Sequence, residues 1–289
     1  MPQRFEHFFN TVEGGNEGDR CHYPVRLDTY GCGCQHNCGY CYARSLLAFR
    51  GLWNPQLPAN ADIKKIYRIV ATKLRPGQVV RLGGMTDCFQ PIEKGRKLTY
   101  RTIQMLNARR VHYLIVTKGA LVATDPYLEV MDRRLAHIQV SITTSSPELS
   151  RRLEPGASLP DERKAAVETL AREGFDVAVR LSPFIPDLVS VPWVNAIDCD
   201  KILVEFLRVN AWIEKWLAIT ELPVDLRPYT LFNAGYKHLP LSRKQALIDQ
   251  IRGASWKEVS VCEDVPEHWT WWKDHLNANP DDCCNLKIQ

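Results

Sequence analysis

Three cysteines in one short loop are the residues of this sequence whose type and spacing are best suited to chemistry. Cys34, Cys38 and Cys41 stand in the spacing C-x3-C-x2-C, and with Cys32 they place four of the ten cysteines within ten residues. Thiolates this close together can converge on one soft-metal centre, because sulfur ligands select iron–sulfur clusters, zinc or Cu(I). An iron–sulfur cube normally takes four cysteines, so a cube held by three keeps one iron with an open coordination position. Open positions at metal sites are where chemistry usually takes place.

A structural zinc site is the alternative for this triplet. Zinc sites usually combine one C-x2-4-C pair with a second, distant pair. Here the three cysteines follow one another in a single short segment, without a second pair. The spacing therefore favours an iron–sulfur cluster. Only one residue separates Cys32 from Cys34, so we interpret Cys32 as a spare thiol.

The triplet is followed by an aromatic residue, Tyr42, and in this it resembles the cluster loop of the radical S-adenosylmethionine enzymes. The resemblance implies a [4Fe-4S] cluster bound by Cys34, Cys38 and Cys41, with S-adenosylmethionine on the fourth iron. It implies that the cluster reductively cleaves S-adenosylmethionine to a 5′-deoxyadenosyl radical, which abstracts hydrogen from a substrate. A reducing partner of the flavodoxin or ferredoxin type is then required.

Further segments resemble one branch of that family, the spore photoproduct lyase-like proteins. The resemblance covers roughly residues 24–190 and is carried by residues 84–93, 116–118, 140–144, 153–156 and 179–183. The tail, with Cys262 and residues 280–286, looks like relatives described as DNA repair photolyase-like. This implies lyase or repair-type chemistry on a nucleobase-like small molecule or a nucleic acid.

Two tyrosines and a lysine are candidates for binding the cofactor. Tyr40 and Tyr42 flank the last cysteine of the triplet, where an aromatic ring can stack on adenine, shield a cluster or simply fill the core. Lys118 follows the apolar segment 113–116, where its charge can neutralise the carboxylate of S-adenosylmethionine. The resemblance places a cofactor-binding lysine in the same Val-Thr-Lys context.

Three hydroxyl residues complete the candidate cofactor site. Ser141 and Ser182 lie where expected strands end, and Thr86 occupies the position of a Thr/Ser-Asp pair in the related family. The resemblance implies contact with the cofactor for all three. Turn or cap hydrogen bonds are the alternative for such hydroxyls.

The source of the returned hydrogen atom departs from the lyase pattern. Gly84 stands where the lyase has its hydrogen-donating cysteine, so Cys88, four residues on, is a candidate donor that can face the cavity from the same loop; a small buried hydrophobe is its alternative. Cys283 and Cys284 are candidates for redox or radical-quenching thiols brought in by a folded-back tail. The tail has no C-x2-C pair, which argues against a zinc ribbon.

Several functions remain open on this basis. Besides a nucleic acid, the substrate of a radical enzyme is a free modified base, as for the related queuine lyase, or a protein side chain. A non-catalytic metal-binding module that interacts with nucleic acid is the alternative from another class. The charge balance of 37 basic and 33 acidic residues is too even to argue for nucleic acid by itself.

The elements that must position these residues alternate between strands and helices. Hydrophobic periodicity predicts strands over 24–30, 79–82, 111–117, 138–143, 177–181 and 201–206, and helices over 61–75, 98–110, 125–135 and 161–173. This order indicates βαβ units and a parallel sheet, and about six units favour a partial (β/α)6 TIM-type barrel over a closed one. The cysteine loop and the other candidate residues then fall at the carboxyl ends of the strands, where such barrels carry out chemistry.

Composition divides the chain into three parts. Residues 1–23 are a polar lead-in, 24–208 form the partial barrel, and 209–289 form an extension, with a helix over 241–252 and a strand over 258–262, that packs on the barrel and covers its mouth. No stretch of about 18 apolar residues occurs, so we expect a cytoplasmic protein without a membrane segment. In a reducing compartment, cysteines serve as metal ligands or reactive thiols more often than as disulfides.

Overall fold

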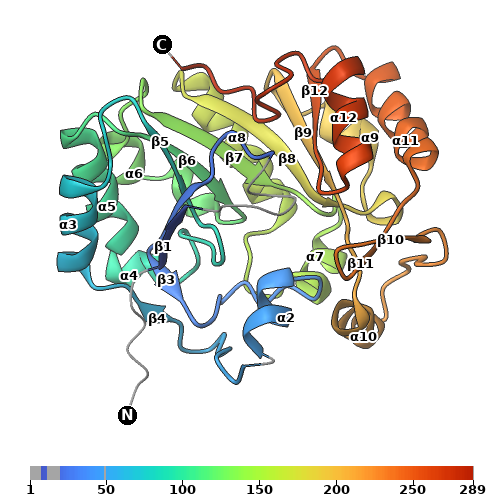
Figure 1. Ribbon diagram of the computed structural model, residues 1–289, viewed down its shortest axis with the longest axis horizontal. Helices are drawn as coiled ribbons and strands as arrows, with labels where there is room; N and C mark the ends of the chain where they lie inside the picture. The colour runs from blue at the N-terminus through green and yellow to red at the C-terminus, as the bar shows by residue number, and fades with distance from the viewer. Residues whose placement is uncertain (1–7, 12–19, 49, 289) are drawn as a thin grey trace.

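The chain is built around one curved sheet with helices packed along its outer side (Figure 1). The structure is a computed structural model that describes residues 8–11, 20–48 and 50–288. The glycine-rich part of the predicted lead-in, Glu13 to Asp19, lies outside the described residues.

The sheet has eight strands in the order β1-β2-β5-β6-β7-β8-β9-β12. Their bounds are β1 Phe8–Thr11, β2 Val25–Asp28, β5 Val79–Leu82, β6 His112–Thr117, β7 Ala136–Ser141, β8 Asp176–Phe184, β9 Lys201–Phe206 and β12 Glu258–Cys262. β1 runs antiparallel to β2, and every other neighbouring pair is parallel. The order has two ends, so the sheet is a partial barrel, as predicted.

Most of the helices lie between successive parallel strands in the chain, and the last helix follows the last strand. The helices are α2 Tyr42–Ala48, α3 Ile63–Thr72, α4 Glu93–Arg96, α5 Leu98–Ala108, α6 Tyr127–Val130, α7 Pro147–Leu153, α8 Pro160–Arg172, α9 Val191–Asn195, α10 Ala211–Thr220, α11 Leu241–Gly253 and α12 Pro266–His275. Two 3-10 turns, η1 Ala120–Ala123 and η2 Pro186–Leu188, also belong to the fold. Two small antiparallel sheets pair β3 Tyr30–Gly31 with β4 Ala59–Asn60 and β10 Leu231–Asn233 with β11 Tyr236–His238.

Local chemistry explains where the main helices begin and end. At the start of α3 the Asp62 side chain accepts a hydrogen bond from the backbone N–H of Lys64, which satisfies one of the free donors of the first turn. At the start of α8, Pro160 occupies the first turn and Glu162 accepts from the N–H of Leu159. Gly174 follows α8 with φ +79°, a conformation that favours glycine.

The structure differs from the sequence-based expectation at three elements. The sheet contains seven parallel strands, not six, because Glu258–Cys262 of the predicted extension pairs in parallel with β9. Phe8–Thr11, in the predicted lead-in, is an edge strand. The helix expected over 125–135 is the single turn α6, because Asp132 forms a turn in which its side chain accepts from the N–H of Arg134.

The carboxyl-terminal tail lies against the inner side of the sheet. Cys284 and Leu286 pack on a small buried cluster of Tyr23, Val79 and Leu114. The Tyr23 hydroxyl donates to Asp282 across 2.6 Å. The tail therefore helps to line the interior of the partial barrel. In the described residues, no helix is long and apolar enough to span a membrane.

Candidate active site

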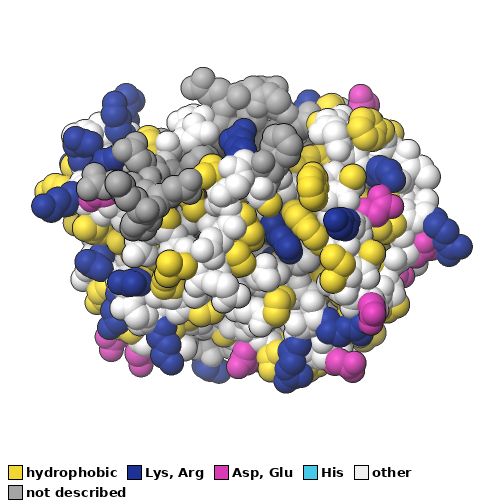
Figure 2. All heavy atoms as spheres, turned by 90° about the horizontal axis from the view of Figure 1, so that it is seen from below, with side chains coloured by type: hydrophobic (Ala, Val, Ile, Leu, Met, Phe, Trp, Pro, Cys, Tyr) yellow, Lys and Arg dark blue, Asp and Glu magenta, His cyan; other side chains and the backbone are white. Residues whose placement is uncertain are grey.

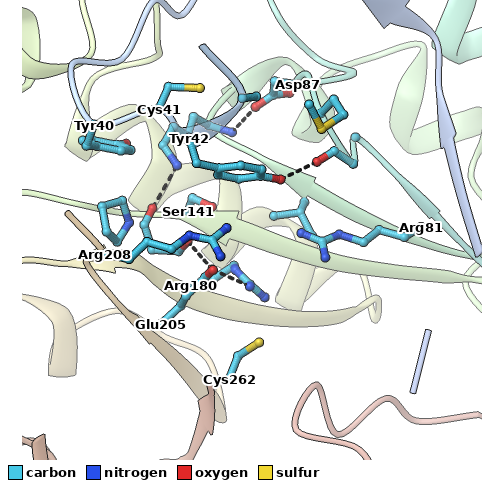
Figure 3. A pocket seen from close by; sticks show the side chains of 18 of the residues that line it. Tyr40, Cys41, Tyr42, Arg81, Asp87, Ser141, Arg180, Glu205, Arg208 and Cys262 are labelled. Atoms are coloured by element: carbon cyan, nitrogen blue, oxygen red, sulfur yellow. Dashed lines mark hydrogen bonds and ion pairs between the residues drawn. The ribbon is translucent and has the colours of Figure 1, made fainter. Parts of the chain in front are cut away.

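A cavity opens at the carboxyl ends of the parallel strands. The side chains of Cys34, Cys38 and Cys41 line it on one side, and Cys262, Cys283 and Cys284 line it from β12 and the tail. Figure 3 shows Cys41 on one side of the cavity and Cys262 on the other, with Tyr42, Arg180 and Glu205 between them. Two groups of thiols from distant parts of the chain therefore face one space.

The loop that carries the first three cysteines is tightly packed by its neighbours. A Cβ atom at Gly33, which has φ +151°, would lie 2.0 Å from the backbone oxygen of Asn54. Gly156 approaches so closely that a Cβ there would lie 1.9 Å from the oxygen of Gln35. These positions require glycine, because any side chain would push the loop off its supports. The cysteine loop is therefore held in place by two neighbouring segments.

Burial controls the ionisation of these thiols. Cys34 and Cys38 are buried, and burial raises the pKa of Cys34 to about 12 and that of Cys38 well above its usual value. The pKa of Cys41 is also raised by burial. Without a bound cation the three thiols stay protonated at neutral pH, since metal binding is what releases such protons.

Asp87 organises the segment after β5. Its carboxylate accepts from the Thr117 hydroxyl and the Lys118 backbone N–H, both across 2.7 Å, and lies 3.2 Å from His36 Nδ1. Burial alone would raise its pKa, but His36 and these hydrogen bonds hold the pKa of Asp87 at about 2. An ionised Asp87 thus joins the cysteine loop to the end of β6.

Lys118 points into the cavity from the end of β6. Its Nζ donates to the backbone oxygen of Ser182 across 2.9 Å and lies 5.6 Å from the centre of the Tyr40 ring. Lys118 therefore lies at the strand end at which it was expected.

Tyr40 lines the cavity with its ring and is anchored by its hydroxyl. The hydroxyl donates to Glu154, whose carboxylate also pairs with Arg163. Glu154 and Arg163 are both about 1% exposed. This buried triad fixes the ring of Tyr40 at the cavity wall.

Tyr42 spans the cavity beside a cation. Its hydroxyl donates to the backbone oxygen of Gly84 across 2.7 Å, and the guanidinium of Arg208 lies 4.5 Å from its ring centre. Arg208 itself forms an ion pair with Asp264 at 2.5 Å. The ring of Tyr42 is therefore held at both its edge and its face (Figure 3).

Thr86 is positioned by a buried carboxylate that the sequence analysis did not identify. Asp28, at the end of β2, accepts from the backbone N–H groups of Met85 and Thr86 at 3.0 Å each, and burial raises its pKa to about 6. The Thr86 hydroxyl donates to the backbone oxygen of Tyr30 across 2.6 Å. Thr86 lines the cavity, but its hydroxyl proton already has a partner within the protein.

Ser141 in β7 and Ser182 in β8 also line the cavity. The Ser182 hydroxyl donates to Glu205 across 2.7 Å, and Arg180 donates to the same carboxylate across 2.6 Å. Arg180 and Arg208 lower the pKa of Glu205 against the effect of burial. The backbone oxygen of Ser141 accepts from Arg163 across 2.9 Å.

Cys88 does not reach the cavity. Its side chain is 1% exposed, lies in the hydrophobic core and does not line the cavity. The backbone carbonyl of Cys88 accepts a hydrogen bond from the Thr99 hydroxyl across 2.7 Å, which holds this segment against the core. The expectation that Cys88 faces the cavity is therefore wrong. A Cβ at Gly84 would lie 2.8 Å from the Arg26 side chain, so that position has little room for the thiol of the related lyases either.

The tail cysteines do reach the cavity. Cys262, Cys283 and Cys284 all line it, and the neighbouring thiols of Cys262 and Cys284, together with burial, raise the pKa of Cys283 well above its usual value. The neighbouring thiol of Cys283 lowers the pKa of Cys284 to about 7, helped by Arg180.

Comparison with known proteins decides the family. Residues 29–189 match the family model described as the Radical SAM superfamily, and this match covers more than half of the chain. The chain belongs to the radical SAM superfamily. Members of this superfamily use a [4Fe-4S] cluster and S-adenosylmethionine, so the predicted cofactors are confirmed, and the superfamily supports an enzyme.

Relatives of this radical SAM protein occur in archaea and bacteria. An uncharacterized protein of Methanocaldococcus jannaschii is 29% identical over 166 residues, which are 56% of this chain and 61% of the relative. The chain thus spans less than two thirds of that relative's length. An uncharacterized protein of Mycobacterium bovis is 26% identical over 240 residues, which are 76% of this chain and 70% of the relative.

The radical SAM protein shares its fold with spore photoproduct lyase. The structure of that lyase complexed with dinucleoside spore photoproduct matches with a TM-score of 0.63 at 15% identity, covering 88% of this chain and 78% of the lyase. A mutant of the lyase with bound AdoMet and the same dinucleoside matches with a TM-score of 0.62 at 16% identity, with the same coverage. The predicted α/β partial barrel is confirmed.

Several residues at the cavity of this radical SAM protein were missed in the sequence. Glu205 and Arg208 flank the end of the predicted strand 201–206, and their position at a carboxyl end could have identified them. Asp28 is the last residue of β2, and Asp87 lies in the segment that follows β5. Trp269 also lines the cavity, from a helix that was not predicted.

Proposed function

We propose that this protein is a radical SAM enzyme with lyase or repair-type chemistry on a nucleobase-like or nucleic-acid substrate. The observation that supports it most strongly is the single cavity that the three cysteines, Lys118 and Tyr42 line together. In the proposal, the cluster-bound S-adenosylmethionine supplies a 5′-deoxyadenosyl radical when both groups are present.

Cys34, Cys38 and Cys41 would hold the cluster. The three cysteines line one cavity together, and their spacing in a single short segment favours an iron–sulfur cluster over a mononuclear zinc site. Cys32 does not line the cavity, in agreement with its interpretation as a spare thiol.

Other residues of the chain would bind and orient S-adenosylmethionine. The Lys118 ammonium carries three donors, so its bond to Ser182 leaves capacity for a carboxylate. The fixed rings of Tyr40 and Tyr42 offer flat surfaces for adenine. Because these rings are held by hydrogen bonds, they order the site before the cofactor arrives.

The cavity walls suit a flat, anionic substrate. Arg20, Arg81 and Arg208 line it together with Trp269, so both cations and an aromatic ring are present. Figure 2, which views the molecule from the side of α2 and α10, shows basic and acidic side chains interspersed, with hydrophobic ones across the middle. A cavity that contains arginines and a tryptophan, together with a face that has no broad basic patch (Figure 2), favours a base, nucleotide or single-stranded end over broad contact with a duplex.

The alternatives differ in what they require of this cavity. A free modified base needs the aromatic wall but not the arginines, and a protein side chain needs neither in particular. A non-catalytic metal-binding module would not need Lys118 beside the cysteine loop. The structure of spore photoproduct lyase, which shares this fold, contains a dinucleoside, and this favours a nucleotide as the substrate.

Binding of a fluorescent single-stranded oligonucleotide at several salt concentrations tests the substrate class. We expect binding that weakens as salt rises, and weaker binding for Arg208→Met than for the exposed control Arg133→Met. Equal binding by both variants, or no binding at low salt, would exclude the nucleic-acid substrate and leave the free base. Formation of 5′-deoxyadenosine, measured in parallel, reports on the radical reaction itself.

A further inference from the structure

Polar side chains from three neighbouring strands are joined by hydrogen bonds beside the cavity. Arg180 of β8 donates from Nη1 to Oε1 of Gln139 on β7 and from Nη2 to Oε2 of Glu205 on β9, both across 2.6 Å. Gln139 is 1% exposed and Arg180 is 2% exposed. Because buried ion pairs add little net stability to a fold, the clearest effect of this network is to fix the position of the Glu205 carboxylate.

The two oxygens of the Glu205 carboxylate differ in what they bind. Oε2 accepts from Arg180 and also from the Ser182 hydroxyl across 2.7 Å, which uses both of its lone pairs. Oε1 has no hydrogen-bond donor among the residues that the structure describes. The side chain is 27% exposed and lines the cavity. Oε1 is therefore the oxygen that a molecule in the cavity can reach.

Glu205 offers only acceptor sites to such a molecule. Burial alone would raise the pKa of Glu205, but Arg180, Arg208 and the Ser182 hydroxyl hold it below its usual range. An ionised carboxylate accepts hydrogen bonds and has no proton to donate. An occupant that removes water from Oε1 without bringing a donor leaves a charged acceptor unpaired, which is costly. The cavity therefore favours a molecule with an N–H or O–H group at this point.

Glu205 lies on the side of the cavity away from the cysteine loop. Its partner in the sheet register is Cys262 of β12. Figure 3 shows Tyr42 and Arg208 between Cys41 and the Glu205 carboxylate. Since S-adenosylmethionine is expected at the cluster, a carboxylate on this side faces the substrate.

The strongest neutral donor of a nucleobase is a ring N–H next to a carbonyl group. Bases of the uracil and guanine type carry such an N–H, which is more acidic than an exocyclic amino group. In bases of the cytosine and adenine type the corresponding ring nitrogen has no hydrogen, so its lone pair would face the lone pairs of Oε1. Arg81 and Arg208 also line the cavity and carry donors that suit carbonyl or phosphate oxygens.

We propose that Glu205 determines which base the enzyme accepts, because its Oε1 binds the ring N–H of a base of the uracil or guanine type. This inference rests on the proposed function, which places a nucleobase-like substrate in the cavity. Glu205 is then a specificity residue that discriminates against bases whose ring nitrogen lacks this hydrogen.

Two matched pairs of nucleotides test the proposal on the wild-type protein. Uridine and cytidine monophosphate (UMP and CMP) are nearly the same size, as are guanosine and adenosine monophosphate (GMP and AMP). Calorimetry on cluster-loaded protein with S-adenosylmethionine and no reductant measures binding without turnover. We expect UMP to bind about 10- to 100-fold more tightly than CMP, or GMP than AMP, the range for a hydrogen bond to a charged group.

A preference in one pair alone would support the proposal and identify the ring size that fits. Equal affinities within both pairs, or a preference for CMP or AMP, would overturn it.

Glu205→Gln tests the role of the carboxylate, because the orientation of the new amide can be predicted. Arg180 and Ser182 both donate to the position of Oε2, so the amide oxygen should occupy that position and the NH2 group should replace Oε1. We expect the preference to shift towards CMP and AMP, whose ring nitrogen accepts. Glu214→Gln on α10, half exposed, is the matched control.

An unchanged preference in Glu205→Gln would place the discrimination elsewhere and overturn the proposal. If this variant does not fold, because Arg180 loses its counter-ion, the comparison of nucleotides on the wild type still decides.

Affinity for S-adenosylmethionine separates the substrate from the cofactor. We expect Glu205→Gln to keep the wild-type affinity. An affinity that falls by about 10-fold or more would mean that Glu205 binds the cofactor, and would overturn the inference while leaving the radical function intact. If the wild type forms 5′-deoxyadenosine but binds none of the four nucleotides, the nucleobase-like substrate fails and the inference fails with it. If it binds them with the expected preference but forms no 5′-deoxyadenosine, only the radical function fails.

Discussion

The ammonium of Lys118 donates a hydrogen bond to the backbone carbonyl oxygen of Ser182 across 2.9 Å. This bond joins the ends of β6 and β8, which are separated in the sheet by β7. It keeps the positive charge of Lys118 at the cavity, next to the ring of Tyr40. The lysine is therefore oriented before any ligand binds.

Replacing Lys118 tests its proposed contact with the carboxylate of S-adenosylmethionine. Lys118→Met keeps the length of the side chain but removes the charge, and a charge-assisted hydrogen bond contributes about 1.5–3 kcal/mol. We expect affinity for S-adenosylmethionine to fall by about 10- to 100-fold, measured by calorimetry on anaerobic, cluster-loaded protein. The exposed Lys215→Met on α10 is the control. Unchanged affinity in Lys118→Met would remove this contact.

The buried pair of Arg163 and Glu154 is expected to stabilise the fold. Arg163→Met leaves the Glu154 carboxylate buried without its cation, which typically costs about 3–5 kcal/mol. The exposed pair of Arg133 and Glu173 is the matched control, because Arg133→Met should cost about 1 kcal/mol or less. Urea unfolding at pH 7 measures both. Similar losses in the two variants would show that burial of the Arg163 pair has no special effect.

Protonation of His238 predicts a pH dependence of stability. Burial, with smaller contributions from Lys244 and Arg208 against that of Glu263, lowers the pKa of His238 from 6.5 to about 4. Since the unfolded chain binds this proton more readily, the stability is present above pH 6.5 and is lost as pH falls towards 4. The expected loss is about 3 kcal/mol.

Unfolding curves at pH 7, 5.5 and 4.5 for the wild type and His238→Gln check this. The difference in unfolding free energy between the two proteins should shift in favour of the variant as pH falls. A constant difference across this range would contradict a lowered pKa for His238.

Much of the barrel could be predicted from the sequence, because its strands are apolar and its helices are amphipathic. Strands β5, β9 and β12 were predicted with their observed bounds. The membership of β12 in the sheet could not be predicted, since periodicity identifies a strand but not its neighbour. The helix α12 was missed because tryptophan and histidine, which dominate it, carry little helical signal.

The candidate site was predictable where local sequence determines position. The end of β6 fixes Lys118, and the end of β8 fixes Ser182, so both were placed at the cavity correctly. Cys88 was not, because whether a loop residue faces the cavity or the core depends on packing against α5, which no local pattern shows. The predicted boundaries at residues 23 and 208 stay predictions, although β1 and β12 belong to the same sheet as the strands between them.

Production of 5′-deoxyadenosine by Cys38→Ala tests the central claim most directly. Purified and reconstituted without oxygen, the wild type and the control Cys32→Ala should be brown and should form 5′-deoxyadenosine from S-adenosylmethionine and dithionite. We expect Cys38→Ala to lose the iron and the product, because Cys38 lines the cavity and Cys32 does not. As much 5′-deoxyadenosine from Cys38→Ala as from the wild type would contradict the account.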